Sequence, residues 1–100
     1  MNTRNEIANT IAEYFKSQPV NKAWIFGSFA RGEETQASDI DILVMLDYSK
    51  HIGLQYFGMA LELEKILGRK VDLVEYDQLM AFAKPSADRD KILIYERGNS

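Results

Sequence analysis

The chain has 100 residues, of which 46% are hydrophobic and 27% are charged. This length fits one compact domain over residues 1–100, without room for a separate acceptor-binding domain, and the composition is that of a folded protein. The formal net charge of -3 provides no basic surface for nucleic acid, and the absence of cysteine excludes disulfides, thiolate catalysis and sulfur-ligated zinc. No apolar run has the length of a membrane span or a signal peptide, so we expect a soluble cytoplasmic protein that binds neither nucleic acid nor membrane directly.

The first half of the chain predicts a helix followed by two strands. Apolar residues at helical spacing predict a helix over about 3–17, which Pro19 ends. The short apolar and aromatic run 22–26 predicts the first strand. Residues 27–32 indicate a tight turn into a short helix, because glycine tolerates unusual torsions. After a polar loop, the alternation of apolar residues over 39–46 predicts the second strand.

The second half predicts a helix, a strand, a short helix and a last strand. Apolar residues three or four positions apart predict a long helix that ends near Gly68. Its apolar face would consist of Ile52, Tyr56, Met59, Leu63 and Ile66. Residues 71–75 and 92–95 predict strands, and 78–83 a short helix. This order of elements predicts an α/β or α+β domain with helices packed on a mixed sheet.

Three aspartates are candidates for metal binding and catalysis. Asp39 and Asp41 are two positions apart on a predicted strand, so both side chains project from the same face. Close carboxylates repel each other unless a cation compensates, and their hard oxygens suit Mg²⁺ or Mn²⁺. Asp72 joins them if its strand is a neighbour, as a metal ligand or as the general base. Taken alone, the Asp39–Asp41 pair would fit an exposed strand start equally well.

A nearby turn offers groups that could hold phosphate. Gly27 and Ser28 stand at a predicted helix N-terminus, where backbone N–H groups, the helix dipole and a hydroxyl favour an anion. Ser28 in this place also fits a simple helix cap. Arg31 lies one helical turn later, where it either faces the phosphates or pairs with an acid such as Asp39.

Residues 27–32 (GSFARG), followed by 38–41 (SDID) and 71–73 (VDL), resemble the minimal nucleotidyltransferase family of the polymerase-β superfamily. The resemblance implies a nucleotidyltransferase fold with two Mg²⁺ ions held by Asp39, Asp41 and Asp72. It implies transfer of a nucleoside monophosphate, AMP from ATP, with release of pyrophosphate. It also implies an antitoxin whose acceptor is a tyrosine hydroxyl of a partner HEPN-domain RNase toxin.

Two other functions stay open at this point. A catalytically silent antitoxin of the same fold would neutralise its partner by binding alone. A small-molecule nucleotidyltransferase would need an oligomer or a helical subunit to hold its acceptor, and the missing acceptor domain counts against it. The sequence leaves open whether the protein forms a homo- or hetero-oligomer.

The remaining chemically distinctive residues favour structural roles. His51 fits the surface, and Arg69 and Lys70 fit a helix C-terminus, where cations complement the dipole. The aromatic residues near the first strand are assigned to packing: Trp24, Phe26 and Phe29. One apolar group on the long helix could also mark a partner surface: Tyr56, Phe57 and Met59.

Overall fold

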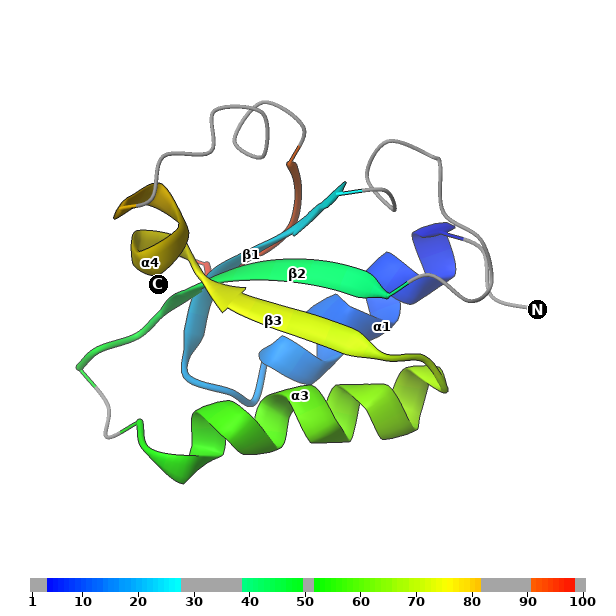
Figure 1. The fold of residues 1–100 in the computed structure, drawn as a ribbon, viewed down its shortest axis with the longest axis horizontal. Coiled ribbons are helices and arrows are strands. Elements are labelled where there is room, and N and C mark those ends of the chain that lie inside the picture. Colours follow the sequence, from blue (N-terminus) through cyan, green and yellow to red (C-terminus); the bar gives the residue numbers. More distant parts are fainter. Residues whose placement is uncertain (1–3, 28–38, 50–51, 82–90, 99–100) are drawn as a thin grey trace.

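The computed structural model describes residues 4–27, 39–49, 52–81 and 91–98. Helices and strands alternate along the chain (Figure 1). The elements are α1 (Arg4–Phe15), β1 (Val20–Phe26), β2 (Ile40–Leu46), α3 (Leu54–Leu67), β3 (Val71–Glu75), α4 (Tyr76–Ala81) and β4 (Ile92–Glu96). The two predicted helices over 3–17 and 52–66 and all four predicted strands are therefore confirmed, with ends shifted by a few residues. The short helix predicted for 27–32 falls almost entirely outside the described residues.

The four strands form one mixed sheet in the order β3-β2-β1-β4. β1 pairs antiparallel with β2 and with β4, whereas β2 and β3 are parallel. Parallel neighbours need a long crossover, and α3 provides it. Because β1 is antiparallel to β2 and β3 is parallel to β2, β1 finishes at the end of the sheet where β2 and β3 begin (Figure 1). This end of the strands is called the acidic edge. This topology confirms the predicted mixed sheet with helices packed on it.

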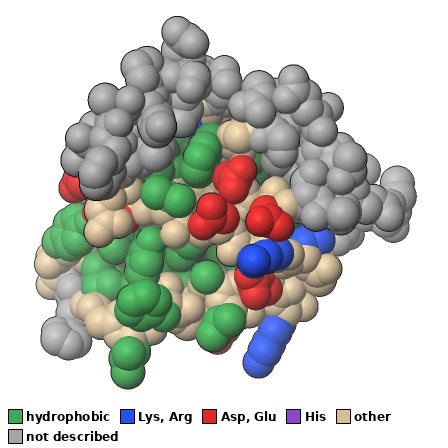
Figure 2. Space-filling view, in the orientation of Figure 1, with side chains coloured by type: hydrophobic (Ala, Val, Ile, Leu, Met, Phe, Trp, Pro, Cys, Tyr) green, Lys and Arg blue, Asp and Glu red, His purple; other side chains and the backbone are tan. Residues whose placement is uncertain are grey.

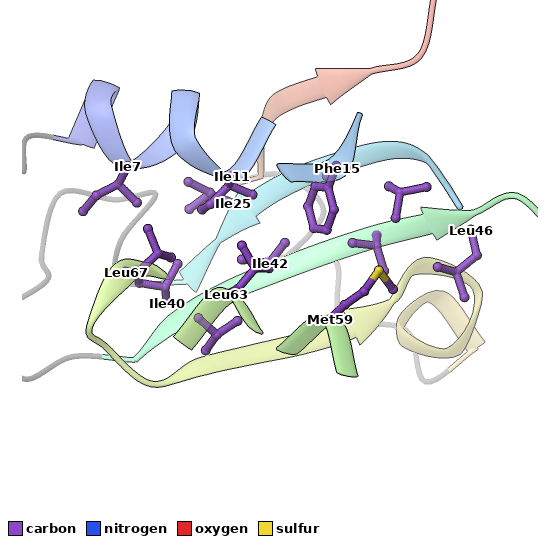
Figure 3. Close-up of a cluster of buried hydrophobic side chains, with 14 residues drawn as sticks. Ile7, Ile11, Phe15, Ile25, Ile40, Ile42, Leu46, Met59, Leu63 and Leu67 are labelled. Atoms are coloured by element: carbon purple, nitrogen blue, oxygen red, sulfur yellow. The ribbon is translucent and has the colours of Figure 1, made fainter. Parts of the chain in front are cut away.

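The main core lies between one face of the sheet and the two long helices, α1 and α3 (Figure 3). Alternate residues of β2 point into it, because successive side chains of a strand face opposite sides. Its buried members include Ile11, Phe15, Ile40, Ile42, Val44, Met59 and Leu63, none of which is exposed at all. Burying each such side chain stabilises the fold by about 1.5–3 kcal/mol. In the described residues, no helix is long and apolar enough to cross a membrane.

The inward face of α3 differs slightly from the prediction. Met59, Leu63 and Leu67 are buried, whereas Ile66 is 51% exposed. A step of about 100° per residue places Leu67 in line with Leu63, and Ile66 falls at the border of that face. The predicted end of the helix is confirmed, because Gly68 adopts a φ of 67° and its N–H donates to the Glu64 carbonyl at 2.8 Å.

The opposite face of the sheet holds a smaller apolar group. Trp24 pairs with Leu43 in the β1–β2 register, and both are buried although neither belongs to the main core. The Trp24 ring packs on Tyr76 at the start of α4, with ring centroids 5.1 Å apart. The predicted packing role of Trp24 is thus confirmed, on the face of the sheet that α1 and α3 leave uncovered. Phe29 lies outside the described residues.

Candidate active site

Two of the three predicted acids are paired by the sheet itself. In the parallel ladder between β2 and β3, Asp41 is the register partner of Asp72, one position after the pair formed by Ile40 and Val71. Side chains at paired positions project from the same face, and Ile40 and Val71 are buried in the main core. Asp41 and Asp72 therefore both project from the opposite face. The condition set by the sequence, that the two strands be neighbours, is met.

Gly27 brings the end of β1 against this acid pair. Phe26, the last residue of β1, is the register partner of Asp41, and Gly27 follows with a φ of 74°. A Cβ atom at Gly27 would overlap the Asp41 carboxylate oxygen Oδ2. Two independent conditions thus require glycine here, a left-handed backbone and direct packing of the backbone on a carboxylate.

Asp39 also lies at the acidic edge, but it precedes β2 and has no register partner in the part of the sheet that the structure describes. It is exposed and immediately precedes β2, so the strand begins one residue later than the predicted range 39–46. The N–H of the next residue, Ile40, donates to the Lys70 carbonyl at 2.9 Å, which ties the beginnings of β2 and β3 together. Across residues 4–27, 39–49, 52–81 and 91–98, no three His, Cys, Asp or Glu side chains are gathered closely enough to hold one metal ion. The metal-binding role of Asp39, Asp41 and Asp72 stays a prediction.

The phosphate-binding prediction rests on the turn after β1. Gly27 is described, and its backbone lies beside Asp41, whereas Ser28 and Arg31 lie outside the described residues. Their proposed contacts with phosphate therefore stay predictions, as does the choice between a phosphate and Asp39 as the partner of Arg31.

The negative charge of Asp72 affects the pKa of Tyr56 on α3. The Tyr56 hydroxyl donates to the Leu73 carbonyl at 3.0 Å, next to Asp72 in the chain. Burial raises the pKa of Tyr56, and the negative charge of Asp72 raises it further. In Figure 2 acidic side chains gather near the middle of the visible face, bordered by Lys and Arg side chains.

The sequence reasoning missed a lysine near the acidic edge. Lys91 precedes β4, whose first residue, Ile92, is the register partner of Ile25 near the end of β1. Its ammonium group lies 5.8 Å from the Trp24 ring centroid, a cation–π contact. The sequence did predict a strand from Ile92, and Lys91 immediately precedes it. Because β4 pairs antiparallel with β1, the residue before β4 lies close to the end of β1, where Gly27 follows.

The comparison with protein families agrees with this geometry. The family described as "Polymerase beta, Nucleotidyltransferase" matches residues 9–100. The chain belongs to this nucleotidyltransferase family. The matched region contains all six residues proposed for the site, which confirms the family indicated by the motifs of the sequence.

Curated relatives from two organisms match most of the chain. A protein of Methanocaldococcus jannaschii assigned as a protein adenylyltransferase is 39% identical over 80 residues, covering 80% of this chain and 85% of its own length. Protein adenylyltransferase MntA of Thermococcus cleftensis is 32% identical over 75 residues, covering 75% of each chain.

Solved structures confirm the fold. A structure assigned as a minimal nucleotidyltransferase has a TM-score of 0.71 and 28% identity, and the match covers 85% of this chain and 86% of that chain. A toxin–antitoxin crystal structure with AMP-PNP has a TM-score of 0.69 and 21% identity, covering 90% and 73%. A chain in the structure of a tri-AMPylated Shewanella oneidensis HEPN toxin in complex with MNT antitoxin matches with a TM-score of 0.66 and 18% identity. This match covers 95% of this chain and 74% of that chain.

Proposed function

We propose that this nucleotidyltransferase is an antitoxin that transfers AMP from ATP to a tyrosine hydroxyl of a partner HEPN toxin. The relatives assigned as protein adenylyltransferases support a protein acceptor. The structures of similar fold with AMP-PNP and with an AMPylated HEPN toxin support the donor and the type of partner.

The observation that carries this proposal is the close arrangement of Asp41, Asp72 and Gly27. The acid pair is fixed by the register of two parallel strands, and the backbone of Gly27 lies against one of its carboxylates. A phosphate chain held at the turn after β1 would thus lie beside the acids. Such proximity of donor and catalytic groups is the main protein contribution to phosphoryl transfer.

The donor set at this edge fits Mg²⁺. Asp39, Asp41 and Asp72 offer only hard carboxylate oxygens, and Gly27 brings backbone rather than a side chain against the Asp41 carboxylate. When bound there, two Mg²⁺ ions would neutralise the triphosphate and make the acceptor hydroxyl more acidic. Asp39 and Asp72 are exposed, and a bound cation would offset the mutual repulsion of the three carboxylates.

The proposed reaction breaks a phosphoanhydride bond of ATP and forms a phosphoester bond to the acceptor. The acceptor hydroxyl oxygen forms a bond to the α-phosphorus of ATP, and the bond from that phosphorus to the pyrophosphate oxygen breaks. Asp72 accepts the hydroxyl proton in this scheme. Ser28 and the backbone of Gly27 hold the triphosphate, and Arg31 compensates the charge of the departing pyrophosphate.

A labelling experiment with a purified HEPN-domain partner tests the proposal. ATP labelled on the α-phosphate should label the toxin in the presence of Mg²⁺, whereas ATP labelled on the γ-phosphate should not. Replacing the acceptor tyrosine of the toxin by phenylalanine should abolish the label. A stable complex with no label from either ATP would contradict the proposal and favour neutralisation by binding alone. Label on a small molecule but not on the toxin would favour the small-molecule reaction.

A further inference from the structure

A pocket of about 230 Å³ lies at the other end of β2 and β3 from the acid pair. Its lining residues are Leu46, Tyr48, Tyr56, Glu75 and Gln78. They come from the C-terminal ends of β2 and β3, the residues after β2, α3 and α4, which lie together on one side of the molecule (Figure 1). The volume is below the roughly 300–1,000 Å³ of small-molecule sites. The pocket therefore has the size for one side chain.

Glu75 places a negative charge in this pocket. It is the last residue of β3 and only 8% exposed, on the same face of the strand as Val71 and Leu73. Its Oε1 accepts a hydrogen bond from the Gln78 N–H at 3.0 Å, so that the side chain caps α4. A carboxylate can accept about four hydrogen bonds, and a buried one is costly without a compensating charge. The cap alone leaves further capacity to accept donors.

The other lining groups suit a cation. Tyr48 and Tyr56 contribute aromatic rings, and the Tyr56 hydroxyl is already directed to the Leu73 carbonyl. None of the five lining residues is basic. Aromatic faces beside a carboxylate attract an ammonium or guanidinium group through cation–π and charge-assisted hydrogen bonds. The chemistry of the pocket is therefore that of a site for a lysine or arginine side chain.

The surroundings favour a protein as the source of that side chain. Tyr56 packs edge-on against Phe57, which is 67% exposed, and Leu54 at the start of α3 is more exposed still. Tyr48, which lines the pocket, is also largely exposed. Exposed apolar groups around one charged pocket are typical of protein interfaces, in which an anchor residue fills the pocket and its neighbours exclude water.

We propose that this pocket binds a lysine or arginine side chain of the partner protein, as an anchor at the end of the sheet away from the catalytic edge. The identity of that partner rests on the proposed function. The pocket would set the affinity for the acceptor protein, while Asp41 and Asp72 perform the transfer. The two roles are separable, because the pocket and the acid pair lie at opposite ends of the same two strands.

A titration of the protein alone tests the chemistry of the pocket. N-acetyl-arginine amide should shift the NMR signals of Gln78 and Tyr56, whereas N-acetyl-citrulline amide, its neutral isostere, should not. Glu75→Gln keeps a carbonyl oxygen to cap Gln78 but removes the charge. It should weaken arginine binding by roughly 10-fold to 100-fold, the loss expected for a charged hydrogen bond. Equal shifts with both amides, or equal affinity in both proteins, would overturn the proposal.

A second experiment, a binding titration with the HEPN toxin, tests whether the side chain that fills the pocket comes from the partner protein. Glu75→Gln should weaken the complex with the HEPN toxin and raise the KM for the toxin, with the KM for ATP unchanged. The matched control is Glu13→Gln, which removes an exposed acid on α1 and should leave the complex unchanged. Arginine amide binding without any effect of Glu75→Gln on the complex would overturn the partner assignment. Asp41→Asn separates the two proposals, because it should abolish transfer and leave arginine binding intact.

Discussion

Asp41 on β2 and Asp72 on β3 occupy the same register position of a parallel ladder, and both project from the face of the sheet that α1 and α3 leave uncovered. Their relative position is therefore set by backbone hydrogen bonds of two strands. Catalytic groups on strands are held more precisely than groups on loops. The backbone at both acids is thus held by the strand ladder, and variants around them give the sharpest tests.

Gly27→Ala should reduce nucleotide transfer strongly. The new Cβ atom would overlap Asp41 Oδ2, and the left-handed backbone adds strain of about 1–2 kcal/mol. Gly68→Ala is the matched control, because Gly68 has nearly the same φ but no atom within 4 Å of the added Cβ. Both variants should lower the free energy of unfolding in urea, and only Gly27→Ala should also abolish labelling. Full activity in Gly27→Ala would show that the Asp41 carboxylate can move without consequence.

Met59→Ala should destabilise the fold by about 2–5 kcal/mol, because it leaves a cavity between α3 and the sheet. Leu61→Ala on the same helix should change stability by no more than about 0.5 kcal/mol, since Leu61 is 61% exposed. Chemical denaturation of both variants measures the difference. Equal losses would mean that α3 buries a different face.

Stability should fall at alkaline pH, in part because of Tyr14. Burial raises the pKa of Tyr14 above its ordinary value of 10.0, and a hydrogen bond to Glu62 and the charge of Glu62 raise it further. The folded state therefore holds this proton more tightly than the unfolded state. Its contribution is complete below about pH 10 and is lost as the pH rises through the folded pKa.

Denaturation between about pH 8 and about pH 12 measures this loss. Tyr14→Phe should be less stable than the wild type at neutral pH, and the difference should shrink as the pH rises. Other groups that titrate in this range affect both proteins alike, so the difference between them isolates Tyr14. A difference that stays constant across the range would contradict the assigned pKa shift.

Much of this fold is predictable from the sequence because its periodic signals are strong. The alternation after Asp39 predicted β2 and the face of both aspartates, and Gly68 marked the end of α3. The pairing of β2 with β3 could be stated only as a condition, since nothing local to either strand specifies its neighbour. The sheet register then decides whether Asp41 and Asp72 meet.

The exposure of Ile66 and the pocket at Glu75 depend on three-dimensional packing and could not be predicted from the sequence. The exposure of Ile66 depends on how α3 is rotated against the sheet, and spacing by three or four residues leaves that rotation uncertain by about one residue. The buried carboxylate of Glu75 had a signal in the sequence, an acid that alternates with Val71 and Leu73 on the inward side of β3. Its meaning depended on the pocket, which elements distant in sequence assemble.

The most direct test of the central claim is transfer of α-labelled AMP to the HEPN toxin by wild type and by Asp41→Asn, at equal occupancy of the complex. Asparagine keeps the size of the side chain but removes the charge that the site requires, and transfer should fall by about 100-fold or more. Folding and binding of the toxin should be unchanged. Normal transfer by a folded Asp41→Asn variant would contradict the assignment of the active site to this edge of the sheet.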